Sequence, residues 1–207
     1  MERYTLPIFS AGCFSVVLLF GCMNQGAKST AGGSSSTGST SSGSTTAASK
    51  APAPAGGAMA RASIEGRSGS TMSGTATFTE TGEGVRVLVN VKGAPAGLHA
   101  VHLHEKGDCS AADATSAGGH FNPEPKHHHG GPNSPEHHPG DFGNMTVGPE
   151  GNGKLELATK DLTVAPGSHS VVGLSIIVHE KADDLKSDPS GNAGGRIGCG
   201  VIQKANP

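Results

Sequence analysis

Short stretches in which apolar and polar residues alternate follow one another along the chain from about residue 60. The clearest runs from Val85 to Lys92, where every second residue is valine, directly after the turn Gly82-Glu83-Gly84. Successive side chains of a β-strand point to opposite faces, so a period of two is typical of a strand with one buried face. Such patterns, bounded by turn residues, predict strands at 62–67, 71–80, 85–92, 98–105, 144–147, 155–161, 171–179 and 197–203.

Eight short strands without a helical pattern predict an all-β fold, an antiparallel sandwich or barrel. Two connections, at about 106–141 and 180–195, are too long for hairpins. Long loops without secondary structure in a compact domain are usually functional. Because both begin at strands that carry histidines, they are the segments in which we expect the chemistry.

The N-terminal part of the chain has a different pattern. Residues 6–21 form an apolar run that is short for a membrane span and resembles a signal peptide. Leu19, Gly21 and Cys22 match the lipobox of bacterial lipoproteins, so residues 1–21 are predicted to be a signal peptide and Cys22 to be acylated. An ordinary signal peptide cut nearby is the alternative. Residues 22–59, rich in Ser, Thr, Gly, Ala and Pro, are predicted to be a disordered tether, leaving residues 60–207 as one exported domain.

The composition of the chain limits its possible partners, the residues of its core and the state of its cysteines. Residues 60–207 carry 12 basic and 16 acidic side chains, a net charge near −4 that argues against nucleic acid as a partner. The chain has no Trp and only 1 Tyr, so its core must come from aliphatic residues and a few phenylalanines. Of 4 cysteines, Cys13 leaves with the signal peptide and Cys22 takes lipid. Cys109 and Cys199 remain, and in an exported domain they favour a disulfide over two free thiols or metal ligands.

The histidines form the most informative pattern. His102 and His104 are two residues apart, so on a strand they share a face. His179 ends the apolar run 171–178. Between them the following residues recur at nearly even spacing: His120, His129, His138 and Asp141. Sets rich in imidazole with one carboxylate suit copper and zinc, and seven ligands serve two four-coordinate metals only if one histidine is shared.

Six segments in this order resemble copper/zinc superoxide dismutase, and the resemblance extends over about residues 60–203. They are GLHAVHLHEKGDC at 97–109, AGGHFNP at 117–123, HGGP at 129–132, HPGD at 138–141, VHEKADD at 178–184 and GNAGGRIGCGVI at 191–202. The resemblance implies an eight-stranded antiparallel Greek-key β-sandwich or barrel, and the dismutation of superoxide by copper that cycles between Cu²⁺ and Cu⁺ beside Zn²⁺.

The resemblance also implies a role for each residue. Copper would be bound by His102, His104, His120 and His179, and zinc by His120, His129, His138 and Asp141. His120 would be the shared, catalytic ligand, and Arg196 would attract and position superoxide. Asp183 would join a copper histidine to a zinc histidine, and Cys109 would pair with Cys199.

Some choices stay open in the sequence. Spacing from His120 would favour His128 over His129, whereas the following Gly-Gly-Pro favours His129; Gly140-Asp141 favours His138 over His137. The spare histidines at 127, 128 and 137 could bind extra metal, and Lys186 could help to attract the substrate. The expected location is the cell envelope, with the lipid membrane as a partner through Cys22 and a homodimer as a possibility. A copper or zinc store without turnover is the alternative function, which would not need Arg196.

Overall fold

The computed structural model describes residues 57–125 and 127–205. The predicted signal peptide and nearly all of the predicted tether, including Cys22, lie outside these residues. Within them the strands are β1 (Met59–Gly66), β2 (Ser73–Thr81), β3 (Gly84–Lys92), β4 (Gly97–His104), β5 (Asp141–Val147), β6 (Gly153–Thr159), β7 (Ser175–His179), β8 (Arg196–Val201) and β9 (Gln203–Ala205). A single 3₁₀ turn, η1 (Thr115–Ala117), interrupts the long loop after β4.

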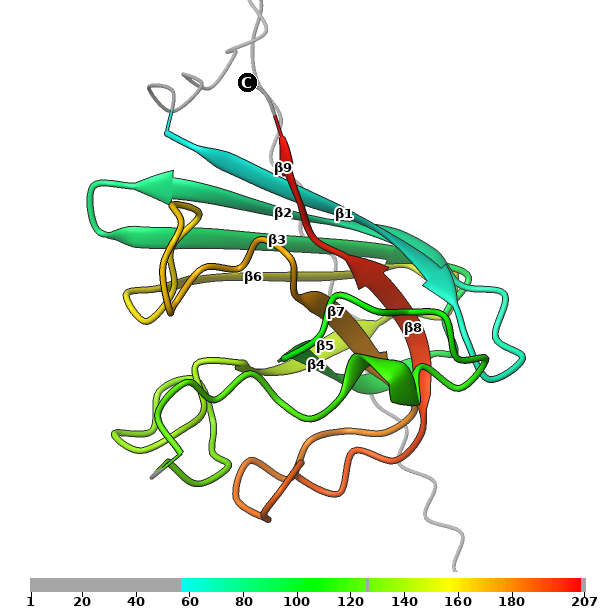
Figure 1. Cartoon of the computed structure of the whole chain (residues 1–207). Helices are drawn as coiled ribbons and strands as arrows, with labels where there is room; N and C mark the ends of the chain where they lie inside the picture. The colour runs from blue at the N-terminus through cyan, green and yellow to red at the C-terminus, as the bar shows by residue number, and fades with distance from the viewer. Residues whose placement is uncertain (1–56, 126, 206–207) are drawn as a thin grey trace, which may run out of the picture. The chain divides into compact units, whose positions relative to one another are not determined.

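All neighbouring strands are antiparallel, in the order β2-β3-β6-β5-β4-β7-β8-β1. The pairing of β1 with β2 closes this sheet into a barrel, and β9 adds to the edge of β1 (Figure 1). Although β3 and β4 are consecutive in the chain, β6 and β5 lie between them, a Greek-key connection. The predicted eight-stranded antiparallel fold is confirmed.

The core is aliphatic, as the composition predicts. In β3 the side chains of Val85, Val87, Val89 and Val91 are buried and alternate with exposed or half-buried residues. Burial of a valine side chain stabilises a fold by about 1.5–3 kcal/mol. The alternation therefore fixes which face of β3 points into the barrel, because a shift of register by one residue would expose all four valines.

In β4, by contrast, both faces are buried from His99 to His104. Val101 and Leu103 belong to the barrel core, so the intervening His102 and His104 point outward. Their side chains are nevertheless buried, because the two long loops, 105–140 and 180–195, lie on the same side of the barrel (Figure 1). A functional pocket can thus form outside the barrel without opening its core.

The strand predicted at 197–203 is divided into β8 and β9, and the strand predicted at 171–179 is shorter than expected. β7 begins at Ser175, whereas the apolar run begins at Val171. Gly173 has φ +88°, and the amide of Leu174 donates to the carbonyl of Val171, so the chain turns there. Val171 is fully buried in the core, which shows that apolar character followed burial rather than strand conformation. Among the described residues, no helix is long and apolar enough to span a membrane.

Candidate metal centre

Four imidazoles gather on the outer face of β4 and β7. The ring of His102 lies 4.1 Å from that of His120 and 4.8 Å from that of His179, measured between centroids, and the ring of His104 lies 5.1 Å from that of His120. His120 reaches this group because its backbone forms an isolated bridge with His104. One ring nitrogen from each residue lies within 4.8 Å of the others. Register shifts interrupt the pairing of β4 at Ala100/His102 and of β7 at Val178/His179. They turn the side chains of His102 and His179 toward the group.

The hydrogen bonds of these rings leave one nitrogen of each facing the centre of the group. Nε2 of His102 donates to Asp183, Nδ1 of His104 donates to the carbonyl of Gly118, and Nδ1 of His179 faces the carbonyl of Gly194. Nδ1 of His102 and Nε2 of His104, His120 and His179 are buried without a hydrogen-bond partner among the described residues. Buried polar atoms are rarely left unpaired. Four unpaired nitrogens together therefore fit a metal ion of the type that imidazole favours.

A second set surrounds the carboxylate of Asp141 at the start of β5. Its Oδ1 lies 2.7 Å from Nδ1 of His120, 3.0 Å from Nδ1 of His129 and 3.3 Å from Nδ1 of His138. The nitrogen of His129 makes no hydrogen bond there despite its proximity. The other oxygen, Oδ2, accepts the amides of Gly130 and His138, both at 3.0 Å, which fixes the carboxylate. Three nitrogens and one oxygen are a donor set that suits tetrahedral zinc.

The structure distinguishes the neighbouring histidines between which the sequence left a choice. The side chain of His129 is fully buried in the second set, whereas that of His128 is 72% exposed and bonded to Asp188. His138 belongs to the second set, whereas His137 turns to the carbonyl of Ser134. Burial and distance thus bring together the histidines that the flanking motifs favoured.

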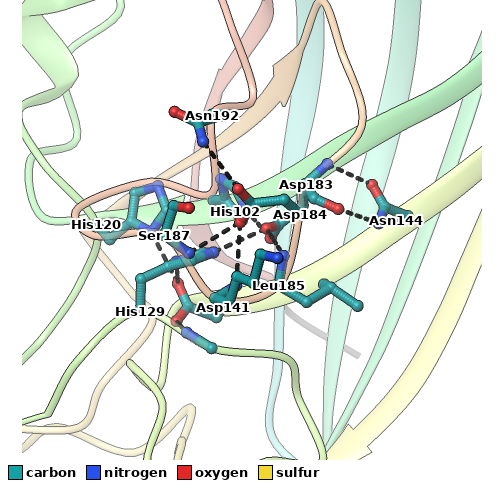
Figure 2. Close-up of polar contacts among 12 residues, drawn as sticks. His102, His120, His129, Asp141, Asn144, Asp183, Asp184, Leu185, Ser187 and Asn192 are labelled. Carbon is teal, nitrogen blue, oxygen red and sulfur yellow. Dashed lines mark hydrogen bonds and ion pairs between the residues drawn. The ribbon is translucent and has the colours of Figure 1, made fainter.

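The carboxylate of Asp183 connects the two sets. Its Oδ2 accepts from Nε2 of His102 and its Oδ1 from Nε2 of His129, both at 2.8 Å (Figure 2). Asn144 on β5 holds Asp183 in turn: its Nδ2 donates to the carbonyl of Asp183, and its Oδ1 accepts the amide. Sequence reasoning missed Asn144, whose only signal is a polar side chain between the buried residues Gly143 and Met145 of β5.

Asp188, in the 180–195 loop, is a second residue that sequence reasoning missed. Its Oδ1 accepts the amide of His129 at 2.7 Å, and its Oδ2 accepts Nδ1 of His128. Asp183 and Asp188 therefore hold His129 from one loop, through its ring and its backbone. Nothing in the local sequence Ser-Asp-Pro-Ser distinguishes Asp188 from an ordinary turn residue.

Arg196 lies beside the first set. It begins β8, directly opposite His179 of β7. Its Nη1 donates to the carbonyl of Ala114 and its Nη2 to that of Gly118, both at 2.7 Å. The carbonyl of Gly118 also accepts Nδ1 of His104, so one peptide group fixes both a ring of the first set and the guanidinium. Burial lowers the pKa of Arg196 and the charge of Asp113 opposes this, but a guanidinium remains charged in proteins.

Burial dominates the titration of three histidines of the first set. It lowers the pKa of His104 to about 2, with the charge of His120 as the next cause. It lowers the pKa of His179 to about 3, with the charge of His102 next. It lowers the pKa of His120 to about 4, against the raising effect of the hydrogen bond to Asp141. These rings are therefore neutral at pH 7, the form that binds metal.

The pKa of His129, in the second set, shifts in the opposite direction. Burial acts to lower the pKa of His129, but the close carboxylates of Asp141 and Asp183 outweigh it and raise this pKa to about 9. Burial likewise acts to raise the pKa of both carboxyls, but hydrogen bonds from the histidines hold the pKa of Asp141 and of Asp183 well below the usual range. This concentrated negative charge favours a cation at the second set.

The predicted disulfide is present between Cys109 and Cys199, 90 residues apart. Cys199 packs with Ala114, Ala117 and Ile177 in a small apolar cluster outside the main core. The disulfide and this cluster attach the first part of the 105–140 loop to β7 and β8. The peptide groups that hold Arg196 and His104 belong to the same stretch.

Comparison with known proteins identifies the family. The family model for copper/zinc superoxide dismutase matches residues 72–202. "Superoxide dismutase [Cu-Zn]" of Deinococcus radiodurans is 41% identical over 145 residues, 65% of this chain and 79% of that protein. "Superoxide dismutase [Cu-Zn] 4" of Dictyostelium discoideum is 41% identical over 143 residues, 66% of this chain and 93% of that protein.

Two further similarities extend this result. "Extracellular superoxide dismutase [Cu-Zn]" of Caenorhabditis elegans is 39% identical over 135 residues, 62% of this chain and 60% of that protein. The crystal structure of the clock protein EA4 superposes with a TM-score of 0.64 at 37% identity, covering 75% of this chain and 99% of that one.

A histidine-rich metal centre built on the outside of a Greek-key barrel defines the class of protein, a metalloenzyme with two adjacent metal sets. The chain belongs to the copper/zinc superoxide dismutase family. Its activity is the dismutation of superoxide, with copper and zinc as cofactors.

Proposed function

We propose that the first set is the copper site and the second the zinc site of this dismutase. Copper is bound by His102, His104, His120 and His179, and zinc by His120, His129, His138 and Asp141. The observation that carries this assignment is the position of His120, which belongs to both sets and presents Nε2 to one and Nδ1 to the other. When bound, copper supplies one-electron transfer in both directions and zinc supplies a fixed positive charge.

The chain's own residues supply position and protons. Two superoxide anions and two protons give O₂ and H₂O₂. Nε2 of His120 can hold one of these protons and release it to the departing peroxide, while Nδ1 keeps the ring aligned with Asp141. Asp183 fixes the ring planes of His102 and His129, an arrangement that raises the basicity of ligand histidines. Arg196 draws the anionic substrate toward the copper set and orients it through its planar donors.

Metal analysis of two variants tests the ligand assignment. We expect His120→Ala to lower the content of both metals, because the ring is common to both sets. His179→Ala should lower copper and leave zinc, because His179 belongs to the first set alone. Full occupancy of both metals in His120→Ala would contradict the shared ligand.

The role of Arg196 is tested by comparing charge changes of equal size. Arg196→Glu should lower kcat/KM strongly with metal content unchanged, and Arg196→Lys should retain part of the rate because the charge remains. Arg86→Glu is the matched control: it makes the same change in net charge on β3, where Arg86 pairs with Glu156 at the surface. Added salt should slow the wild type, since charges are screened over about 8–10 Å near physiological ionic strength. Equal loss of rate in both glutamate variants would point to net charge instead of a local guide.

A copper or zinc store without turnover is the alternative function. It requires the histidines but not a guanidinium hydrogen-bonded beside them. The two carbonyls that fix Arg196 therefore support turnover over storage.

We also propose that the protein is exported and anchored in the cell envelope through acylated Cys22. The support is the lipobox-like Leu19-Phe20-Gly21-Cys22 and the Ser/Gly-rich stretch after it. Two or more acyl chains give stable anchoring. Cys22→Ser should move the protein from the detergent phase to the aqueous phase, or block its processing; unchanged partitioning would favour an ordinary signal peptide. A homodimer stays a prediction, to be checked by the molar mass in solution.

A further inference from the structure

A third group of metal-binding side chains lies at the surface, where the 105–140 loop meets the loop between β6 and β7. Nε2 of His127 lies 3.4 Å from Oε2 of Glu124, and Nε2 of His169, from the other loop, lies 3.8 Å from Oε1 of the same carboxylate. The side chains of His127 and His169 are about a third exposed, 32% and 35%, and that of Glu124 is 56% exposed. The group is thus open to solvent, unlike the buried sets.

The hydrogen bonding of His169 makes this arrangement specific. Its Nδ1 lies 2.8 Å from the carbonyl oxygen of Asp161, which can only accept, so Nδ1 carries the proton. In the neutral ring, Nε2 then presents a lone pair toward a carboxylate oxygen of Glu124. Two lone pairs that face each other repel unless a proton or a metal ion lies between them. An imidazole that donates one nitrogen to a backbone carbonyl and offers the other is the usual form of a metal-binding histidine.

The distances also suit a shared ion. Hydrogen bonds from nitrogen to oxygen are about 2.7–3.2 Å long. A nitrogen and an oxygen bound to one tetrahedral zinc ion at about 2.0–2.2 Å are about 3.4 Å apart. The separation of 3.4 Å between His127 and Glu124 matches this value, and the 3.8 Å at His169 can close by rotation of the exposed Glu124 side chain.

We propose that Glu124, His127 and His169 form a third metal site, for a divalent ion such as Zn²⁺ or Cu²⁺, which joins the two loops. Two imidazoles and one carboxylate are a donor set for these metals. The three ligand atoms are not all within 4.8 Å of one another, as they are in the buried sets, so the site binds more weakly and exchanges its ion with solvent. His127 is two residues from His129, so an ion held here also restrains the segment that carries a residue of the buried centre.

Zinc titration of the full chain tests the proposal. The protein is first loaded with copper and zinc in the buried sets, and Zn²⁺ alone is then added in a calorimeter. All 11 histidines lie between residues 99 and 179, so the N-terminal region adds no imidazole to the titration. We expect one further equivalent to bind per chain. The double variant Glu124→Gln, His169→Gln should bind it at least about tenfold more weakly, since loss of even an indirect partner of a metal costs about 10–100-fold.

His128→Gln is the matched control, because it removes a neighbouring exposed histidine that faces Asp188 instead of this group. It should keep the further equivalent. Hydrogen exchange gives a second measurement: Zn²⁺ should slow the amides around residues 124–128 and 167–170 together. Absence of the equivalent in the wild type, its retention in the double variant, its loss in His128→Gln, or slowing confined to one loop would each overturn the proposal.

Discussion

The metal-free protein should lose stability steeply as the pH falls from 7 to 5. Three buried histidines have a pKa far below the value of 6.5 expected in the unfolded chain: about 2 for His104, 4 for His120 and 3 for His179. The unfolded state therefore binds more protons than the folded state below pH 6.5, so the free energy of unfolding falls with pH. At pH 5.5 each histidine lowers the free energy of unfolding by about 1.4 kcal/mol, and all three together lower it by about 4 kcal/mol.

A loss of this size is a large part of the usual 5–15 kcal/mol. Of the other groups with a shifted pKa, His129 offsets a smaller part of it between pH 7 and 5.5. The raised pKa of His129, about 9, gives stability that is fully present below pH 6.5 and is lost as the pH rises through 9. The lowered pKa values of Asp141 and Asp183 act only below the usual carboxyl range. Between pH 6.5 and 5.5 the three neutral rings therefore decide the slope.

Urea unfolding of the metal-free protein at pH 7 and 5.5 measures this difference, and two variants apportion it. His179→Gln should remove about a third of the difference, since it removes one of the three rings. His128→Gln, at an exposed histidine, should leave the difference unchanged. An equal free energy of unfolding at the two pH values would refute the reasoning. So would a difference between the two pH values that both variants reduce equally.

The remaining predictions concern the two long loops. Replacing Cys109 and Cys199 together by serine should lower the free energy of unfolding by about 4–5 kcal/mol in the chain-entropy view of a 90-residue loop, as urea unfolding would show; equal stability would mean that the loop holds without the bond. Gly191→Ala should lower zinc and copper binding, because the new Cβ would lie 1.9 Å from Oδ1 of Asp183 at φ +63°, whereas Gly82→Ala, with nothing within 4 Å, should not. Metal analysis of both variants checks this, and equal metal content would show that Asp183 can move without cost.

Periodicity and motif order in the sequence were enough to predict much of the fold. The alternating valines of β3 predicted a strand because one face of that strand is buried and the other is exposed. Burial of one face requires an apolar residue at every second position. The run from 171 to 178 misled for a related reason. Its residues 171–174 are apolar because they pack on the core, and a buried turn at Gly173 has no period that distinguishes it from a buried strand.

The candidate ligands were identified in the sequence because each histidine lies in a recognisable short segment, and the flanking Gly-Gly-Pro already favoured His129 over His128. The resemblance implied that His120 is shared by both sets, and the tertiary structure supplied the geometry of that sharing, buried His129 and left His128 exposed. The tertiary structure alone revealed Asn144 and Asp188, whose partners lie 39 and 59 residues away. Such groups act by holding other side chains in position. That role depends on which loops meet in space, and such contacts cannot be predicted from the residue types and their local order.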